Sequence, residues 1–534
     1  MATPDALELQ KTRFDLSQAN GKKKLEILTE GQDPRGLIQA LPPQELYLAM
    51  LDIGLDDCAP IVALASPQQF KHFIDASCWP RRDAPPDPRK IMRWLTLARE
   101  GGGTSDLALR RFHTKLANLD VELFALLLRR EFEVIDLTEN EFPELPDEAM
   151  TWTTPDRRYM VVFNEEGSPY AILKRLLDDL AQENPFHVSR MLEALRWELP
   201  SELEETSRRW RDGRLRDAGV PDLEEALAFV ARPARKAGAP ETGLHANSLH
   251  GNDLAPSKST ALTAALQVQP MLDRAMSKLG GQAQVQAEES IAYAANAALV
   301  AWKVQVDDPE ELRPALLNAR GLLSLGLEIL GNGDEEEAAR IISDEPVRTV
   351  FQAAMAELYR LQTRARAAAQ AGRLPESQRT TLFGPPLSSL LEALNRTPPV
   401  LDGVRLHSAY RHAPESRAEI ARADLLIDEA TTLPKLLLGM ELTPAMLGLA
   451  ATAAEIAPTA LRASDAIAAL VRSDLRGVPF SLKELPEPGV ALPEGFAQRL
   501  DVRLNQGIDS NPDGPERAAA RRLSDRLRSA VLAR

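Results

Sequence analysis

The sequence has few of the residues on which disulfide-bonded, metal-bound and β-rich proteins depend. Its 534 residues include only two cysteines, Cys58 and Cys78, and aromatic residues make up 5%. Two thiols are too few for a disulfide framework or a zinc ribbon, and we expect both to be buried as small apolar side chains. The scarcity of aromatic residues, together with abundant Ala, Leu and Glu, favours helices packed on helices.

Long apolar runs are also missing. No window of about 18 uninterrupted apolar residues occurs, so the sequence predicts no transmembrane segment. The first residues, MATPDALELQKTRFDL, mix charged and apolar side chains and contain no signal-peptide core, which predicts a cytoplasmic protein. The net charge of −15 makes nucleic acid an unfavoured partner, because duplex binding needs a basic face.

Familiar catalytic and nucleotide-binding motifs are absent from the sequence. It contains no H-E-x-x-H pattern, no P-loop and no G-x-S-x-G elbow. The glycines of Gly101–Asp106 could cradle an anion, but we interpret this segment as a loop in which Ser105 or Asp106 caps the next helix. We therefore expect no cofactor, and an enzymatic function is less favoured than a binding function.

A helix-opening pattern occurs twice near the start of the chain. The segment Asp33–Leu41, DPRGLIQAL, returns as Asp87–Leu95, DPRKIMRWL. Aspartate suits the cap and proline the first helical position, so both copies predict a helix whose apolar stripe is buried by stacking. We expect Arg35 and Arg89 to be solvated, which makes the repeat architectural rather than a binding motif.

These features predict an all-α, multi-domain protein of stacked short helices, interrupted by one small β-hairpin near residues 150–163. We expect helical structure up to Val134 and a capping box formed by Ser201 and Glu204. The expected parts are a helical lead-in at 1–32, an N-terminal helical-repeat domain with the hairpin at 33–231, a linker at 232–259, a central helical bundle at 260–375 and a C-terminal helical region at 376–534.

Three segments share the pattern of a known protein family: Glu45–Trp79, Arg208–Ala231 and Glu288–Leu330. In these segments the chain resembles DUF6178, a family of uncharacterised bacterial proteins. The segments spread over roughly the first two thirds of the chain. They are diffuse patterns rather than a catalytic signature, so the resemblance implies no reaction and no catalytic residue.

One basic cluster is a candidate binding site. It consists of Arg208, Arg209, Trp210, Arg211 and Arg214. Arginines can bind an anion and Trp210 can stack on a base, which predicts a site for a small anionic ligand or a nucleotide. The alternative is an ordinary solvated helix face, because Glu204/Arg208 and Glu205/Arg209 have the spacing of favourable helical ion pairs.

A second candidate site would bind a metal ion through His245, His250 and Asp253. Two histidines five residues apart point to different faces of a helix, so they could share a metal ion only on a loop. The surrounding residues have the composition of a loop. The alternative interpretation is a polar linker without a metal ion.

The end of the chain predicts an arginine-rich helix over Pro515–Arg534. Leu523, Leu527 and Val531 form one apolar stripe on it. Such a helix can dock on an acidic partner or an anionic membrane surface, or it can pack against the rest of the protein.

Three functions follow from these observations. The favoured one is a non-catalytic cytoplasmic scaffold or adaptor that binds another protein through its helical stack. The second is a regulatory module that binds a small anionic ligand or nucleotide between helical domains, using the arginines of 208–216. The third is a metal-dependent enzyme on a novel helical scaffold. The sequence leaves the identity of the partner and the oligomeric state open.

Overall fold

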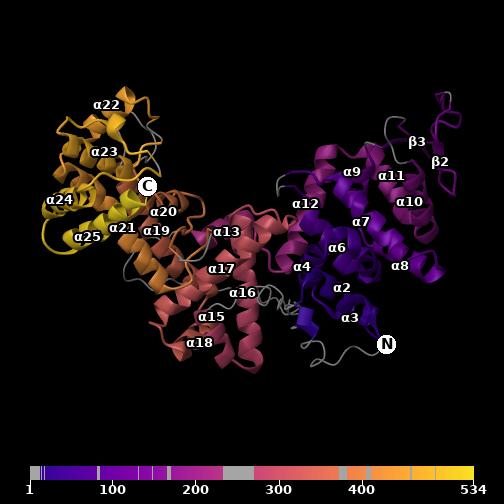
Figure 1. Ribbon diagram of the computed structural model, residues 1–534. Helices are drawn as coiled ribbons and strands as arrows, with labels where there is room; N and C mark the ends of the chain where they lie inside the picture. Colours follow the sequence, from indigo (N-terminus) through magenta and orange to yellow (C-terminus); the bar gives the residue numbers. More distant parts are fainter. Residues whose placement is uncertain are drawn as a thin grey trace. The chain divides into compact units, whose positions relative to one another are not determined.

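The computed structural model of the protein describes residues 12–13, 15–16, 19–80, 84–129, 131–146, 148–164, 170–231, 270–371, 382–404, 411–457, 460–487 and 489–533. They form two compact units (Figure 1). The first unit contains the described residues up to Phe229 and those from Gly280 to Leu316. The second contains residues 230–231, 270–279 and the chain from Leu317 onward. Both units are mostly helical, as the sequence predicts.

The first unit begins with short helices that start at proline or polar caps. They are α2 (Gly21–Thr29), α3 (Pro34–Ala40), α4 (Pro43–Ile53), α5 (Ala59–Leu64), α6 (Pro67–Ser77), α7 (Pro88–Glu100), α8 (Asp106–Ala117) and α9 (Val121–Leu128). Asp33 accepts a hydrogen bond from the backbone N–H of Gly36 at 2.9 Å, and Asp87 accepts one from Arg89 at 2.9 Å. The repeated pattern therefore opens α3 and α7, as predicted. Ser105 caps α8, which confirms that interpretation as well.

A three-stranded antiparallel sheet follows these helices. The expected hairpin is present as β2 (Thr151–Thr153) and β3 (Tyr159–Phe163), and the strand order is β1-β3-β2. The additional strand β1 (Phe132–Asp136) corrects the expectation of helical structure up to Val134. Its sequence, FEVID, buries its two end residues and exposes Glu133, and its backbone pairs along the whole of β3. Tertiary pairing decides the structure of so short a segment.

Further helices complete the first unit: α10 (Tyr170–Glu183), α11 (Pro185–Trp197), α12 (Pro200–Asp217), α13 (Leu223–Val230) up to Phe229, α16 (Gly281–Ala301) and the start of α17 (Pro309–Leu330). The capping box expected at Ser201 is wrong. Helix α12 begins at Pro200, and its cap is Leu199, two residues before Ser201, with no side-chain hydrogen bond at the cap. Proline fits the first helical position, so Ser201 lies inside the helix.

The core of the first unit contains many of the few aromatic residues in the chain. The rings of Tyr47, Phe73 and Trp94 lie together, with 5.3 Å between the Phe73 and Trp94 centroids. Cys58 and Cys78 are both buried and free, as predicted. Burial raises the pKa of the Cys58 thiol to about 12, so this side chain is an uncharged apolar group at neutral pH.

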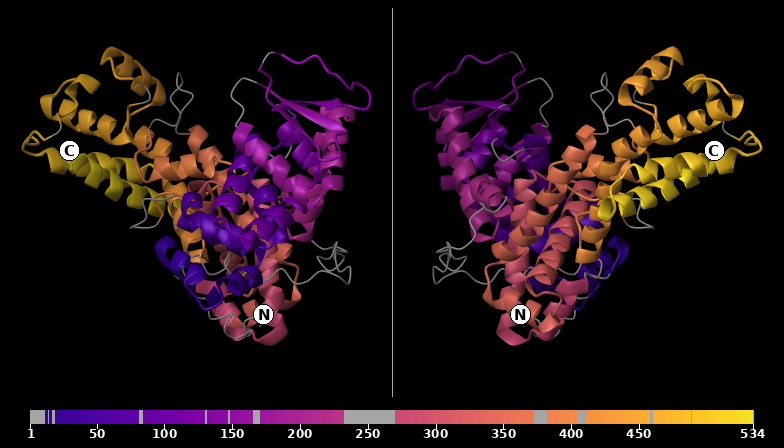
Figure 2. Two further views of the ribbon diagram at one scale, coloured as in Figure 1. Left: turned by 90° about the vertical axis from the view of Figure 1, so that its right-hand side faces the viewer. Right: turned by 90° about the vertical axis from the view of Figure 1, so that its left-hand side faces the viewer.

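The second unit is built around α21 (Arg417–Gly439). The other elements are α15 (Pro270–Lys278), the remainder of α17, α18 (Glu335–Asp344), α19 (Val347–Ala371), α20 (Leu387–Leu394), α22 (Pro444–Ala453), α23 (Ala463–Arg476), α24 (Phe496–Asp509) and α25 (Pro515–Leu532). Helix α21 packs against α19, α24 and α25. Leu523, Leu527 and Val531 of α25 are buried, so the terminal helix packs on its own unit (Figure 2).

Among the described helices, none alone is both long and apolar enough to cross a bilayer. Helices α21 and α22 meet the criteria of length and composition only as a pair, and the chain bends by 77° between them.

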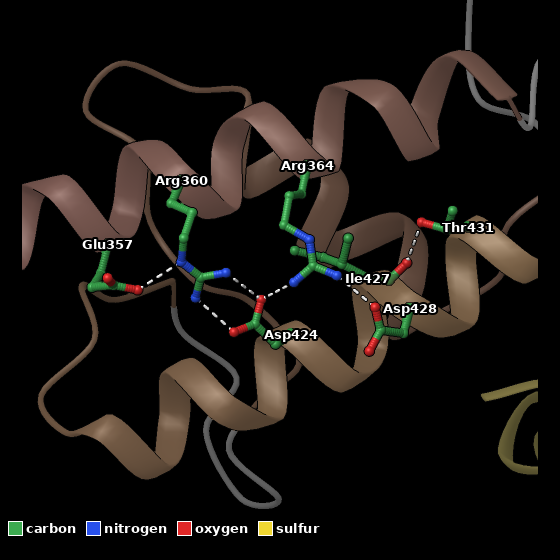
Figure 3. Close-up of polar contacts among 7 residues, drawn as sticks. All are labelled: Glu357, Arg360, Arg364, Asp424, Ile427, Asp428 and Thr431. Carbon is green, nitrogen blue, oxygen red and sulfur yellow. Dashed lines mark hydrogen bonds and ion pairs between the residues drawn. The ribbon is translucent and has the colours of Figure 1, made fainter. Parts of the chain in front are cut away.

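Ion pairs between helices recur in the second unit in one arrangement. A carboxylate on one helix faces two arginines spaced four residues apart on its neighbour. Asp424 of α21 accepts from Arg360 of α19, with 2.6 Å between Nη2 and Oδ2, and also from Arg364 (Figure 3). Arg364 also donates a hydrogen bond to Asp428, which lies one turn further along α21. Residues four apart share a helix face, which lets one helix present both arginines to the same acid.

The terminal helix is attached through the same arrangement. Glu429 is almost completely buried on α21, and its carboxylate lies 3.5 Å from Nε of Arg522 and 3.0 Å from Nε of Arg526. A buried carboxylate needs such partners, because an isolated charge in the interior is strongly unfavourable. The arginines of α25 therefore help to hold this helix against the rest of the unit, in addition to lying at its surface.

A third copy joins α23 to α24. Asp474 accepts from Nε of Arg499 at 2.9 Å and from Nε of Arg503 at 2.6 Å. The hydrogen bond from Arg503 holds the pKa of the Asp474 carboxyl below its usual value. This contact therefore stabilises the fold at neutral pH, and the stabilisation is lost as the pH falls through that lowered pKa.

We predict that Glu429→Gln destabilises the second unit by about 2–4 kcal/mol, because it leaves two arginines without their buried carboxylate. Asp501→Asn is the matched control. Asp501 of α24 pairs with Arg528 of α25, the helix that also carries Arg522 and Arg526, and both side chains of this pair are about half exposed. The control should cost less than about 1 kcal/mol. Hydrogen exchange of the α25 amides measures both effects. Equal acceleration of exchange in the two variants would contradict the proposed anchoring.

Candidate functional site

The predicted basic cluster lies on α12, and the helix divides it between two faces. Helix α12 packs against α6 and α9. Its buried positions are Leu203, Ser207, Arg211 and Leu215, which follow one another at four-residue spacing. Arg211 therefore faces the interior. The cluster that is continuous in the sequence does not form one surface.

Arg211 is buried and contacts groups of the protein's own core. Its Nε donates to the backbone carbonyl of Asp75 at 2.8 Å, and its guanidinium lies over the Trp79 ring at 5.0 Å from the centroid. Its Nη1 also lies 3.2 Å from Asp212. A buried arginine tolerates this environment because a carbonyl and an aromatic face both stabilise its charge.

Arg214 forms the central ion pair of this region. Its Nε and Nη2 donate to the two carboxylate oxygens of Asp75 at 2.7 and 2.9 Å, and Nη2 also lies 2.8 Å from Asp120. Lys71 pairs with the other oxygen of Asp120 at 3.1 Å. Burial raises the pKa of the Asp75 carboxyl, and the Arg214 guanidinium limits that rise. This network ties α12 to α6 and to the start of α9.

The remaining residues of the cluster face outward. Arg209 and Trp210 are exposed, with 53% of Trp210 accessible. Arg208 pairs with Glu205, three residues before it, rather than with Glu204. Of the five predicted ligand-binding residues, Arg209 and Trp210 thus point to solvent, Arg208 pairs with Glu205 at the surface, and Arg211 and Arg214 contact protein groups of the core.

The predicted metal ligands His245, His250 and Asp253 lie outside the described residues. Within the part of the chain that the structure describes, no group of three or more His, Cys, Asp or Glu side chains is arranged to hold a metal ion. The metal hypothesis therefore gains no support from the described side chains.

The outer face of α11 carries exposed aromatic side chains that sequence reasoning missed. Phe186 is 72% exposed and Trp197 is 68% exposed. They are eleven residues apart, close to three turns at about 3.6 residues per turn, so they lie on one side of the helix. Arg190, between them, is also exposed. We call Phe186, Arg190 and Trp197 the outer α11 face.

The opposite side of α11 is packed in the core. Its buried apolar residues include Val188, Met191, Leu192 and Leu195. The helix contacts α9, α10 and β1. The sequence of α11 contains this signal, because its apolar residues fall on two sides of the helix and only one of those sides packs against the core of the unit.

Several contacts fix the end of α11 that carries Trp197. The guanidinium of Arg196 lies over the Trp197 ring at 4.7 Å from the centroid, and its Nη1 lies 3.2 Å from Asp136 at the end of β1. Arg129 donates to the backbone carbonyl of Glu198 at 3.0 Å. Because one arginine contacts both the ring and the sheet, Trp197 is positioned before any partner binds.

The two faces of α12 give a prediction. Replacing Arg214 with Met should destabilise the first unit by about 3–5 kcal/mol, because it leaves buried Asp75 without its bidentate partner. Replacing exposed Arg209 with Met on the same helix should change stability by less than about 0.5 kcal/mol. Urea unfolding followed by tryptophan fluorescence measures both. Equal costs would show that Arg214 does not anchor the helix.

Comparisons with known proteins bear on the whole chain. Residues 2–507 match the model of a family described as a family of unknown function, DUF6178. No match was found among curated proteins or among solved structures. The match covers nearly all of the 534 residues, including the described part of the first unit and the second unit up to residue 507 in α24. The chain therefore belongs to the DUF6178 family.

Proposed function

We propose that the protein is a non-catalytic adaptor that binds another protein through the outer α11 face. The observation that carries this proposal is the exposure of Phe186 and Trp197 on one side of a helix whose other side is fully packed. Burying one such side chain is worth about 1.5–3 kcal/mol. A partner that covers both would gain much of the free energy that a specific complex needs.

The composition of this face supports protein binding. Tryptophan and arginine are enriched among the residues that dominate binding energy at interfaces. Phe186 and Trp197 are separated by about 16 Å along the helix axis. We therefore expect a partner with two apolar pockets at that spacing and a carboxylate opposite Arg190.

The other proposed functions have less support in the described contacts. A small anion at the cluster of residues 208–214 would compete with Asp75 and Asp120 for Arg214. A cytoplasmic location belongs to the adaptor proposal. The two free, buried cysteines support it, because thiols stay reduced in that compartment.

The test is a double variant, Phe186→Ser with Trp197→Ser. We predict that it raises the dissociation constant for the partner by about 30-fold or more, which corresponds to a loss of about 2 kcal/mol of binding free energy. The matched control, Phe142→Ser with Trp210→Ser, removes the same two residue types at other exposed positions. It should stay within about threefold of the wild type.

The experiment has two stages. The wild type, the double variant and the control are first immobilised and exposed to lysate of the native host, and proteins retained by the wild type and the control but not by the double variant are identified. Isothermal titration calorimetry with the purified partner then gives each dissociation constant. Wild-type affinity in the double variant, or no reproducible partner of the wild type, would contradict the proposal.

A further inference from the structure

A second group of cations lies in the first unit, where α5 packs against α3 and α8. Lys115 of α8 is only 2% exposed, and its Nζ donates to the backbone carbonyl of Ala63 at 2.8 Å. Ala63 is in the last turn of α5, where free carbonyls favour a cation. A lysine so deeply buried ordinarily has a charged partner.

Two arginines belong to the helices that meet here. Arg111 precedes Lys115 by one turn of α8, and Arg35 is in the first turn of α3, which packs against α5, the helix that carries Ala63. Burial and then the charges of Arg111 and Arg35 lower the pKa of the Lys115 amine to about 8. The Nε atoms of both arginines are buried and have no hydrogen-bond partner.

The position of Arg35 corrects an expectation from the sequence. Arg35 and Arg89 occupy equivalent places in the repeated helix-opening pattern, and both were expected to be solvated. Arg89 is exposed, whereas Nε of Arg35 is buried. The repeat is therefore architectural in both copies, but only the first buries part of its arginine.

Other buried cations of the first unit are paired with acids. Lys24 pairs with Asp52, and Arg214 pairs with Asp75. For Arg35, Arg111 and Lys115, by contrast, no ion pair with a carboxylate is formed within the described residues. Asp33, next to Arg35 in the sequence, directs its carboxylate to the backbone N–H of Gly36. Three neighbouring positive charges without a negative partner are unfavourable unless an anion joins them.

We propose that Arg35, Arg111 and Lys115 form a binding site for a phosphate-type oxyanion. The Lys115 amine keeps two protons after its bond to Ala63, and the two guanidiniums supply Nε donors together with their planar forks. Tetrahedral oxyanions accept several such charge-assisted hydrogen bonds at once. Because Lys115 is nearly buried, the ligand reaches it with a compact group, which excludes a nucleic-acid duplex. This site is separate from the outer α11 face in its residues and in its chemistry.

The test uses the full chain, with inorganic phosphate, pyrophosphate and AMP as probes in isothermal titration calorimetry at an ionic strength held constant with NaCl. We expect saturable binding of at least one probe at one site per chain. The ratio of the affinities distinguishes a free phosphate from one carried on a nucleoside. Arg111→Gln and Lys115→Met should each weaken that binding by about tenfold or more.

The matched control is Arg110→Gln, which removes the same charge from the adjacent, exposed position of α8. It should change the dissociation constant by less than about twofold. Lys115→Met removes a buried charge and keeps the length of the side chain, so we expect it to fold, and circular dichroism checks this. If Lys115→Met does not fold, Arg111→Gln still tests the site, because Arg111 is half-exposed and we expect its replacement to leave the fold intact. The proposal is overturned if no probe binds saturably, or if Arg110→Gln weakens binding as much as Arg111→Gln.

Discussion

Carboxylates held by arginines of a neighbouring helix are the contacts on which both units depend. A chain with 5% aromatic residues has few large side chains with which to lock its helices together. In the second unit, Asp424, Glu429 and Asp474 each face two arginines four residues apart. In the first unit, Asp75 joins α6 to α12 through Arg214. Apolar burial supplies most of the stability, and these pairs join particular helices to one another.

Because the helices are joined by such ion pairs, the groups without a comparable partner indicate where the protein could bind something else. In an ion-paired structure, the cations around Lys115 depart from the pattern, because no described carboxylate meets them. The aromatic residues of the outer α11 face depart from it in another way, since scarce aromatic side chains are exposed while others form the core. Cations without a carboxylate partner and exposed aromatic side chains both cost free energy, and binding of a ligand or a partner protein would remove that cost. An adaptor with a separate oxyanion site combines the two observations without requiring a catalytic centre.

Local signals in the sequence predicted much of the fold. The Asp-Pro helix starts, the hairpin near residues 150–163, the buried cysteines and the apolar stripe of the last helix all depend on nearby residues, and all are confirmed. Strand β1 was missed because its structure comes from pairing with β3. The division of the basic cluster was missed because Arg211 and Arg214 are fixed by Asp75, which lies 136 and 139 residues away in the chain. The exposed aromatics of α11 could have been found, since their phase opposes that of the helix's buried residues.

The central claim is that the protein acts by binding through the outer α11 face. Hydrogen–deuterium exchange of the full chain, with and without the partner recovered from the native host, tests it most directly. We predict slower exchange in peptides covering residues 185–199 when the partner is bound, and unchanged exchange in α19 and α21 of the second unit. Protection confined to other segments, with residues 185–199 unaffected, would contradict the claim.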